Sequence, residues 1–415
     1  MAETITIATV DNGDMVRMQG LTEHFTKANP DITVEWVTLD ENTLRQRATT
    51  DIATGGGQFD VVTIGTYEAS IWAERDWLVP LDDLPGGYDI GDLLPPIRAG
   101  LSYDGVLYGA PFYGESSFTM YRTDLFEASD LEMPEEPTWD FIIEAASALT
   151  DREQGVSGIC LRGKAGWGEN MALVTSMANS FGARWFDMDW QPQLDSEAWN
   201  SALTTYAELL SKYGPVDAHS KGYQENLALF QQGQCAIWID ATAAGQFVMN
   251  EDSTVADSVG FAMAPDNGLG KRANWLWAWA LAIPTSTDRQ ESAKKFVAWA
   301  TSKDYLALVA EIDGWASVPP GTRKSLYENP EYQKVPFAAM TLASIESADP
   351  TAPTVEEVPY TGVQFVAFPE FTGIATAVGQ QFADVLEDAA TIEDALKNSQ
   401  WVTEKQMVRV EMLNR

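Results

Sequence analysis

The N-terminal part of the chain alternates between two kinds of hydrophobic pattern. Residues 5–10 and 32–36 carry alternating apolar side chains, which predicts strands, and 59–64 is a nearly all-apolar run typical of a strand buried on both faces. Residues 15–25 and 41–53 lie between them and carry apolar side chains at helical spacing. This strand–helix–strand–helix–strand order predicts a parallel sheet with right-handed crossovers. The chain is therefore predicted to be an α/β protein whose ligand-binding loops follow the carboxyl ends of these strands.

The length of 415 residues exceeds that of one ordinary domain and indicates two to three domains. A Pro- and Gly-rich stretch at 84–100 precedes the segment 107–121, where we expect the chain to pass from one domain into another. The segment 259–264 is the candidate for the return. Further along the chain we expect strands at 156–161, 235–239 and 279–284, and helices at 171–181, 197–212, 225–232 and 290–301.

Acidic residues strongly outnumber basic ones. The chain has 26 Lys and Arg against 61 Asp and Glu, a formal net charge of −35. Such a surface repels phosphate backbones and anionic lipid, so we expect no nucleic-acid binding. The longest apolar run, 275–284, is far shorter than the roughly 20 residues of a membrane span.

Much familiar enzyme and metal chemistry has no counterpart in the sequence. Two cysteines, Cys160 and Cys235, exclude a disulfide scaffold and CxxC motifs, and two histidines exclude almost all His-rich metal sites. Whether the two cysteines pair is left open. The chain carries no HExxH, GxSxG, GxGxxG or GxxxxGKS/T motif. We therefore expect no metal site and no cofactor.

Aromatic residues are the strongest chemical signal, with 15 Trp, 13 Tyr and 17 Phe. Trp275, Trp277 and Trp279 alternate, so a strand would place all three indoles on one face. Any single Trp is most simply explained as part of the hydrophobic core. A row of three is better explained as the wall of a pocket, because flat rings pack against the C–H faces of sugars or polyols while polar groups bind their hydroxyls.

Two carboxylates are candidates for binding hydroxyl groups. Glu115 follows Gly114, and Asp240 follows the predicted strand 235–239. A carboxylate accepts charge-assisted hydrogen bonds from adjacent hydroxyls. The alternatives are a solvated surface position for either residue, a helix-capping role for Asp240 ahead of 242–249, or an acid–nucleophile pair of a glycoside hydrolase. Candidate donors to ligand hydroxyls are Asn12, Arg45 and Lys164.

Taken together, the segments of the chain resemble the extracellular solute-binding proteins of ABC importers, in the maltose-binding-protein-like class. The resemblance covers essentially the whole chain, and its markers are 21–30, 59–62, 108–113, 121–126, 230–238 and 281–284. Within that class the chain is most similar to the sorbitol/mannitol (polyol) binding proteins of proteobacteria, through 8–15, 63–68, 160–170, 274–279 and 314–321.

The resemblance implies a two-lobed periplasmic-binding-protein fold of the class II type, with an interlobe ligand cleft and a hinge of three crossings. We expect these crossings near 111–116, 260–270 and 314–320. The N-terminal lobe would comprise 1–112 and 268–316, and the C-terminal lobe 113–267 and 317–415.

The resemblance also assigns roles to individual residues. Glu115 and Asp240 would accept hydrogen bonds from polyol hydroxyls. Asn12, Arg45 and Tyr67 would grip one end of the ligand from first-lobe loops. The remaining predicted ligand-binding residues are Tyr113, Lys164, Trp167 and Trp315 on hinge or second-lobe segments, and Trp275, Trp277 and Trp279 as the stacking wall.

The function implied is that of a non-catalytic, monomeric receptor that captures a linear hexitol, such as sorbitol or mannitol, and delivers it to the permease subunits of an ABC transporter. The family is periplasmic or secreted, so we expect a periplasmic protein whose signal peptide has been removed. The alternatives are a different mono- or oligosaccharide as ligand, the glycoside hydrolase above, and a carbohydrate-binding interaction module without a transport role.

Overall fold

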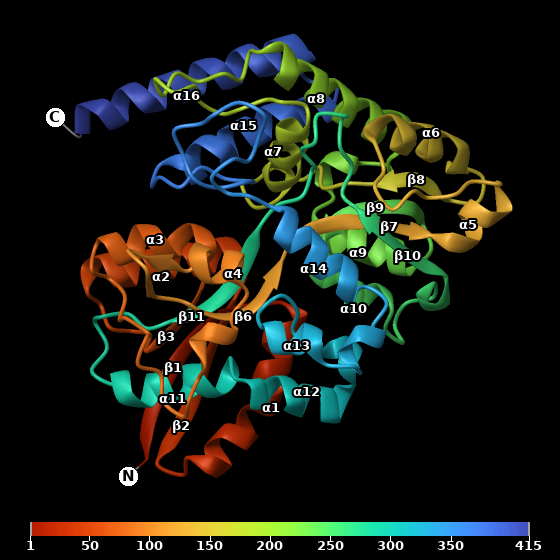
Figure 1. Ribbon diagram of the computed structural model, residues 1–415. Helices are drawn as coiled ribbons and strands as arrows, with labels where there is room; N and C mark the ends of the chain where they lie inside the picture. Colours follow the sequence, from red (N-terminus) through yellow and green to blue (C-terminus); the bar gives the residue numbers. More distant parts are fainter. Residues whose placement is uncertain (1, 414–415) are drawn as a thin grey trace. The chain divides into compact units, whose positions relative to one another are not determined.

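The computed structural model describes residues 2–413, which form two compact units (Figure 1). Unit 1 comprises Met1–Gly114 and Trp277–Ala338, and unit 2 comprises Glu115–Leu276 and Ala339–Arg415. Each unit is built around its own β-sheet with helices packed on it, as expected for an α/β chain of this length.

Unit 1 contains a five-stranded sheet of order β2-β1-β3-β11-β6. β1 pairs in parallel with both β2 and β3, whereas β11 is antiparallel to β3, so the predicted parallel arrangement of the first three strands is confirmed. Figure 1 shows α1 and α11 on one side of this sheet and α2 and α3 on the other. The strands are β1 (Glu3–Val10), β2 (Ile32–Leu39), β3 (Val61–Gly65), β6 (Ala110–Glu115) and β11 (Trp277–Ala282), with a small hairpin of β4 (Ser102–Tyr103) and β5 (Val106–Leu107). The helices are α1 (Gly13–Ala28), α2 (Glu41–Thr54), α3 (Thr66–Glu74), α4 (Pro95–Gly100), α11 (Gln290–Ala300), α12 (Lys303–Asp313) and α13 (Lys324–Glu328).

Unit 2 contains a four-stranded sheet of order β10-β7-β9-β8, in which β7 is antiparallel to both of its neighbours and β8 is parallel to β9. Helix α6 packs on β8, α9 packs on β9, and α7, α8, α15 and α16 pack together. The strands are β7 (Ser117–Arg122), β8 (Ser157–Cys160), β9 (Cys235–Ala241) and β10 (Val259–Met263). The helices are α5 (Thr123–Ala128), α6 (Trp139–Leu149), α7 (Asn170–Ser180), α8 (Glu197–Glu208), α9 (Tyr223–Gln231), α10 (Gly245–Val248), α14 (Ala338–Ser347), α15 (Phe371–Leu386) and α16 (Ile392–Leu413).

Short polar caps start the first two helices of unit 1 directly after their strands. The side chain of Asn12 accepts a hydrogen bond from the backbone N–H of Met15, and the side chain of Asp40 does the same for Thr43. Such caps satisfy N–H groups that have no partner inside the helix. The polar loops therefore lie at the carboxyl ends of β1 and β2, as predicted.

The segment 317–338 belongs to unit 1, so the expected crossing near 314–320 lies inside that unit. The backbone N–H of Gly114 donates to the carbonyl of Pro320, 2.9 Å away. Arg323 is fully buried, and its guanidinium donates to the carbonyl of Thr301 and pairs with Asp92. These contacts tie the segment to unit 1, and the chain passes into unit 2 at Ala339 instead. The other two passages fall after Gly114, within the expected 111–116, and after Leu276, beyond the expected 260–270.

The prediction that Trp275, Trp277 and Trp279 share one strand face is wrong. β11 begins at Trp277, and Trp275 belongs to unit 2. The reason lies in Leu276, whose backbone N–H donates to the side-chain oxygen of Gln364 and whose carbonyl accepts from the side-chain nitrogen of the same residue. The Gln364 amide thus occupies the backbone groups of Leu276 that a neighbouring strand would otherwise bind.

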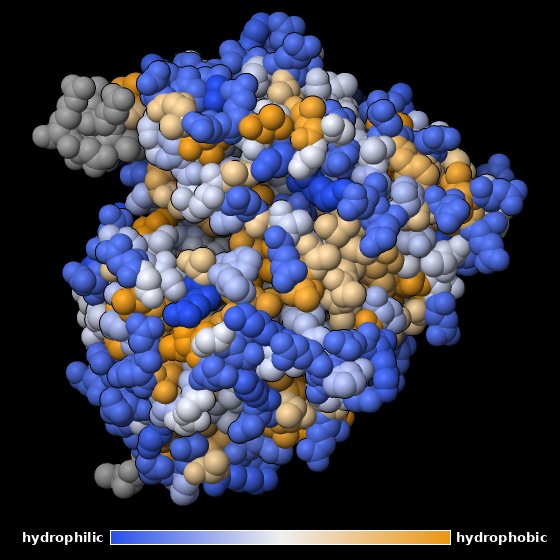
Figure 2. All heavy atoms as spheres, viewed as in Figure 1, coloured by the Kyte–Doolittle hydropathy of each residue, from blue (hydrophilic) through white to orange (hydrophobic). Residues whose placement is uncertain are grey.

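Cys160 and Cys235 form a disulfide that joins β8 to β9, with their Cα atoms 5.9 Å apart. The sequence left this pairing open. Among residues 2–413 no group of acidic, His or Cys side chains is arranged to hold a metal ion, and none of the described helices is long and apolar enough to cross a membrane. On the face drawn in Figure 2, hydrophilic residues dominate the surface and hydrophobic ones form scattered patches, in keeping with the strongly acidic composition.

Candidate functional site

Five of the twelve predicted binding residues belong to two clusters, one in each unit, and in each cluster an arginine contacts both aromatic rings and carboxylates. The unit 1 cluster consists of Arg45, Glu41, Glu68, Trp277 and Trp279. The unit 2 cluster consists of Arg162, Asp240, Glu169, Tyr223 and Trp275.

Arg45 is the centre of the unit 1 cluster. Its guanidinium lies over the ring of Trp277, 5.3 Å from the ring centroid, and over that of Trp279, at 5.1 Å. It also forms ion pairs with Glu41, at 3.0 Å, and with Glu68. Burial lowers the pKa of Arg45 because it disfavours the charged form, and the negative charge of Glu41 opposes this. Arg45 is therefore a cation held in a fixed position against two indole rings.

Glu68 holds Arg45 from the first turn of α3. One of its oxygens binds Arg45, and the other accepts from the backbone N–H of Gly65 at 2.9 Å, the last residue of β3. Sequence reasoning missed Glu68. Its signal was its position three residues after the end of a buried strand, where a Glu side chain reaches back to the residue before the helix.

Asn12, Tyr67 and Tyr113 also lie in unit 1. The Asn12 side chain donates from Nδ2 to the hydroxyl of Tyr113 at 3.1 Å, while its Oδ1 caps α1. Both tyrosines are buried, Tyr67 at the start of α3 and Tyr113 on β6. Trp315, which the sequence placed on a hinge or second-lobe loop, is half-buried on a short turn that follows α12 in unit 1.

An arginine–aspartate pair is the centre of the unit 2 cluster. Asp240 is fully buried near the end of β9, and Arg162 follows the end of the neighbouring strand β8. The Nε atom of Arg162 lies 3.1 and 3.0 Å from the two carboxylate oxygens, and Nη2 lies 2.6 Å from Oδ1. Two parallel N–H···O bonds of this kind fix the geometry of both groups.

Aromatic rings hold the same arginine. The guanidinium lies 5.3 Å from the ring centroids of both Tyr223 and Trp275. Burial by itself would lower the pKa of Arg162, but the charge and hydrogen bonds of Asp240 outweigh it, helped by Glu169 and Glu115, so the pKa of Arg162 is raised. Arg162 therefore stays charged.

Glu115, Lys164 and Trp167 complete the predicted residues of unit 2. Glu115 and Trp167 are buried, and the charge of Glu115 acts on Arg162. Lys164 is 51% exposed and lies 3.8 Å from Glu169, which makes a weak ion pair. The charge of Glu115 therefore links this residue to the arginine of the unit 2 cluster.

Asp240 does not cap a helix, so that alternative is wrong. It lies inside β9, and the turn after β9 has no side-chain cap. Sequence reasoning also missed Arg162, although the residue lies within the segment 160–170 that supported the resemblance. Its signal was its place two residues after Cys160, at the carboxyl end of the strand beside β9.

Each cluster offers a charged donor, carboxylates and aromatic faces, a combination suited to a ligand with many hydroxyls and C–H faces. Within the described residues, the side chains of Thr66 in unit 1 and Ser116 in unit 2 are buried and have no hydrogen-bond partner.

Comparison with known proteins agrees with this chemistry. The sequence pattern of the family described as bacterial extracellular solute-binding protein matches residues 12–307. The chain is 52% identical over 409 residues to a mannitol-binding protein of Pseudomonas aeruginosa, covering 98% of this chain and 94% of that protein. An ABC transporter solute-binding protein of Agrobacterium vitis S4, solved with bound D-mannitol, is 63% identical, covers 99% of each chain and superposes with a TM-score of 0.97.

More distant structures share the fold. A solute-binding protein of Agrobacterium radiobacter K84 in complex with ribitol is 23% identical, with a TM-score of 0.85 over 97% of this chain and 98% of that one. The maltose-bound MalE3 protein of T. maritima is 22% identical, with a TM-score of 0.83 over 98% of this chain and 100% of that one. These likenesses establish the fold alone.

Proposed function

The chain belongs to the family of bacterial extracellular solute-binding proteins, and we propose that it binds a linear hexitol, D-mannitol first, for import by an ABC transporter. Membership of this family confirms the predicted family and the predicted two-lobed solute-binding fold. The proposal itself concerns the ligand, the partner and the location of this chain.

The observation that carries the proposal is the 63% identity, over 99% of each chain, to a protein whose structure holds D-mannitol. The 52% identical relative is also named for mannitol. Sorbitol has less support, because neither of these two relatives is named for it. We therefore expect D-mannitol to be the preferred hexitol.

The chemistry of the two clusters fits such a ligand. An acyclic polyol loses conformational entropy when it is ordered, and direct hydrogen bonds to its hydroxyls offset that loss. In unit 1, Arg45 supplies a charged donor, and Trp277 and Trp279 supply faces for C–H groups. In unit 2, Arg162 supplies a charged donor, Glu115 an acceptor and Trp275 an aromatic face. A site that binds each hydroxyl also rejects analogues that lack one, because a buried polar group is then left unpaired.

The glycoside hydrolase alternative does not fit. The family consists of ligand-binding proteins of transport systems rather than enzymes. In addition, Asp240 is fully buried and ion-paired with Arg162, so its carboxylate is not free to attack a sugar carbon. A module without a transport role would not share nearly its entire length with ABC solute-binding proteins.

A periplasmic location is part of the proposal. The family is extracellular, and a disulfide such as Cys160–Cys235 persists in oxidising compartments. We further propose that the protein acts as a monomer and docks on the permease subunits of its importer.

Calorimetric titration tests the ligand. The chain is titrated with D-mannitol, D-sorbitol, ribitol and maltose, and melting temperatures are measured in parallel, since a ligand that binds the native state raises them. We expect D-mannitol to bind most tightly. Binding of maltose with no binding of any hexitol would overturn the proposal. Turnover of an aryl glycoside would restore the hydrolase alternative.

A further inference from the structure

The carboxylate of Asp240 has its acceptor positions occupied by the protein. Oδ1 accepts from Nε and Nη2 of Arg162 and from the backbone N–H of Ala241 at 2.7 Å. Oδ2 accepts from Nε of Arg162 and from the indole N–H of Trp238 at 3.1 Å. A carboxylate has about four lone-pair sites, and that of Asp240 is 0% exposed. It therefore has little capacity left to accept from a ligand.

Arg162 has capacity to spare. A guanidinium carries five N–H groups. Two of those of Arg162, on Nε and Nη2, are directed at Asp240, and one on Nη1 donates to the carbonyl of Gly168 at 2.8 Å. One N–H on each terminal nitrogen remains for another acceptor. Arg162 is also 8% exposed, so its side chain reaches solvent where Asp240 does not.

We propose that Arg162 donates a hydrogen bond to the polyol ligand and that Asp240 is a positioning residue that holds Arg162 in place. The inference rests on the proposed function and deepens it. It reverses the roles that the sequence suggested, in which Asp240 contacts the ligand and Arg162 has no part.

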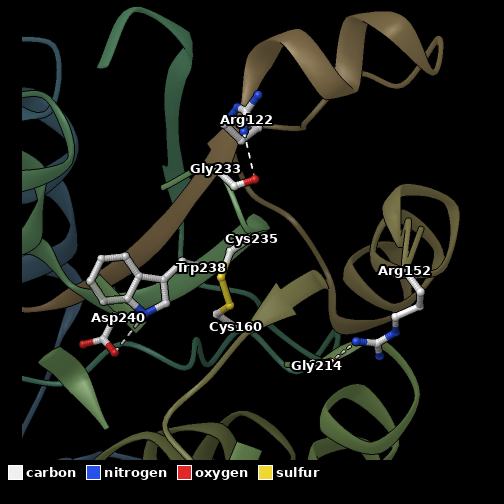
Figure 3. Close-up of a disulfide and its surroundings, with 8 residues drawn as sticks. All are labelled: Arg122, Arg152, Cys160, Gly214, Gly233, Cys235, Trp238 and Asp240. Atoms are coloured by element: carbon white, nitrogen blue, oxygen red, sulfur yellow. Dashed lines mark hydrogen bonds between the residues drawn. A yellow bond between two sulfur atoms is a disulfide. The ribbon is translucent and has the colours of Figure 1, made fainter. Parts of the chain in front are cut away.

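The surroundings of the pair support a fixed donor. Tyr223 and Trp275 flank the guanidinium, and the hydroxyl of Tyr206 donates to the backbone carbonyl of Arg162 at 2.7 Å. Figure 3 shows the Cys160–Cys235 disulfide near Trp238 and Asp240. It links β9, which carries Asp240, to β8, whose last residue lies two positions before Arg162. A donor held in this way binds a ligand with little further loss of side-chain entropy.

Charge also favours a donor role. The guanidinium is surrounded by Asp240, Glu115 and Glu169, which keep it ionised. A neutral hydroxyl can accept from a charged N–H without bringing a second cation into a buried site, and such charge-assisted bonds are stronger than those between neutral groups. The carboxylate of Asp240, whose acceptor positions are occupied, orients the guanidinium of Arg162.

Monodeoxy derivatives of mannitol distinguish a residue that hydrogen-bonds the ligand from one that only holds another residue in place. D-mannitol has a two-fold axis, so its 1-, 2- and 3-deoxy derivatives together cover all six hydroxyls. The affinity of each is measured by calorimetry for the wild-type chain and for the variants Arg162→Met, Arg162→Lys and Asp240→Asn. Melting temperatures and circular dichroism establish that each variant is folded.

We expect Arg162→Met to weaken D-mannitol binding at least about tenfold. In that variant one of the three deoxy derivatives should bind as well as D-mannitol, because the hydroxyl it lacks no longer has a partner. Asp240→Asn should weaken D-mannitol binding. In this variant the same deoxy derivative should still bind more weakly than D-mannitol, by the same factor as in the wild type. Arg162→Lys keeps the charge without the planar fork and should lie between wild type and Arg162→Met.

Arg152→Met is the matched control. Arg152 lies in the same unit and donates to the carbonyls of Gly214 and Lys212, on the other side of the disulfide from Asp240 (Figure 3). Its replacement removes an exposed cation and its two hydrogen bonds. The loss of affinity of each deoxy derivative relative to D-mannitol should stay unchanged.

Two results would overturn the assignment. One is that, in both Arg162 variants, every deoxy derivative loses the same affinity relative to D-mannitol as it does in the wild type. The other is a deoxy derivative whose loss of affinity disappears in Asp240→Asn and persists in Arg162→Met, which would show that Asp240 contacts the ligand. If Asp240→Asn does not fold, the two Arg162 variants decide alone. Failure of the wild-type chain to bind any hexitol is a separate result, which refutes the proposed function.

Discussion

Gly65, at the end of β3, leaves the space that the indole of Trp277 fills. A Cβ atom built at residue 65 would overlap the six-membered ring of Trp277. The same glycine gives its backbone N–H to Glu68, which in turn holds Arg45. One position thus links the aromatic and the charged parts of the unit 1 cluster.

Replacing this glycine is expected to damage the cluster. Gly65→Ala forces the Trp277 ring away from its position, at about 1–3 kcal/mol of folding stability, the usual range for overpacking. D-mannitol affinity should fall with it, as measured by calorimetry. Gly20→Ala is the control, because Gly20 lies within α1 with no atom near its Cβ position, and there alanine should stabilise by about 0.5–1 kcal/mol. Equal effects of the two substitutions would contradict the steric argument.

Sequence patterns predicted the parts of the structure that depend on nearby residues. The strands and helices of the N-terminal part follow from periodicity, whereas the role of Arg45 at one end of the ligand was implied only by the family resemblance. The parts that were missed depend on residues far apart in the chain. Arg162 meets Asp240 across 78 positions, and Gln364 reaches Leu276 across 88. Local pattern carries no information on such contacts, so neither the pairing of Arg162 nor the separation of Trp275 from β11 could be predicted.

Replacement of Arg45 should be visible in tryptophan fluorescence. Arg45→Met removes the cation from Trp277 and Trp279 and leaves Glu68 without its partner, which is expected to weaken D-mannitol binding by about 2 kcal/mol. The emission of the free protein should shift as well, because both rings change their surroundings. Arg47→Met serves as the control, since Arg47 lies on the same helix but stacks on Phe59. A normal affinity in Arg45→Met would remove the unit 1 cluster from the binding site.

The disulfide should contribute strongly to stability. It closes a loop with a sequence separation of 75 residues, for which chain entropy gives about 4 kcal/mol. We expect the Cys160→Ser/Cys235→Ser double variant to unfold at a lower urea concentration than the wild type, with a free energy of unfolding that is lower by about 4 kcal/mol. Addition of dithiothreitol should lower the midpoint of the wild type but not that of the variant. A midpoint insensitive to reductant in the wild type would contradict this.

Asp92 should make the stability of unit 1 depend on pH. Burial alone would raise the pKa of Asp92, but hydrogen bonds from Ser325, the charge of Lys303 and a hydrogen bond from Arg323 outweigh it and lower the pKa below its usual 3.8. The folded state therefore binds this proton less readily than the unfolded state. The stabilisation is complete above the unfolded-state pKa and is lost as the pH falls from there through the lower folded-state pKa.

The Asp92→Asn variant tests this sign. It should be less stable than wild type in urea melts at pH 7, and the difference should shrink as the pH falls below about 4. Asp130→Asn, at an exposed turn after α5, gives the comparison for loss of one negative charge. A stability difference between Asp92→Asn and wild type that grows on acidification would show that the sign is wrong.

The carboxylates of the two clusters should exclude anionic ligands. Arg45 faces Glu41 and Glu68, and Arg162 faces Asp240, Glu115 and Glu169, so in each place the acids outnumber the arginine. A carboxylate on the ligand would meet like charges at short range in a partly buried setting. We expect D-mannonate to bind at least about tenfold more weakly than D-mannitol, whereas the uncharged 1-O-methyl ether of D-mannitol should lose less. Raising the salt concentration should reduce the difference in affinity between D-mannitol and D-mannonate only partly, since buried charges are poorly screened. Equal affinities for D-mannonate and D-mannitol would mean that these acids lie away from the ligand.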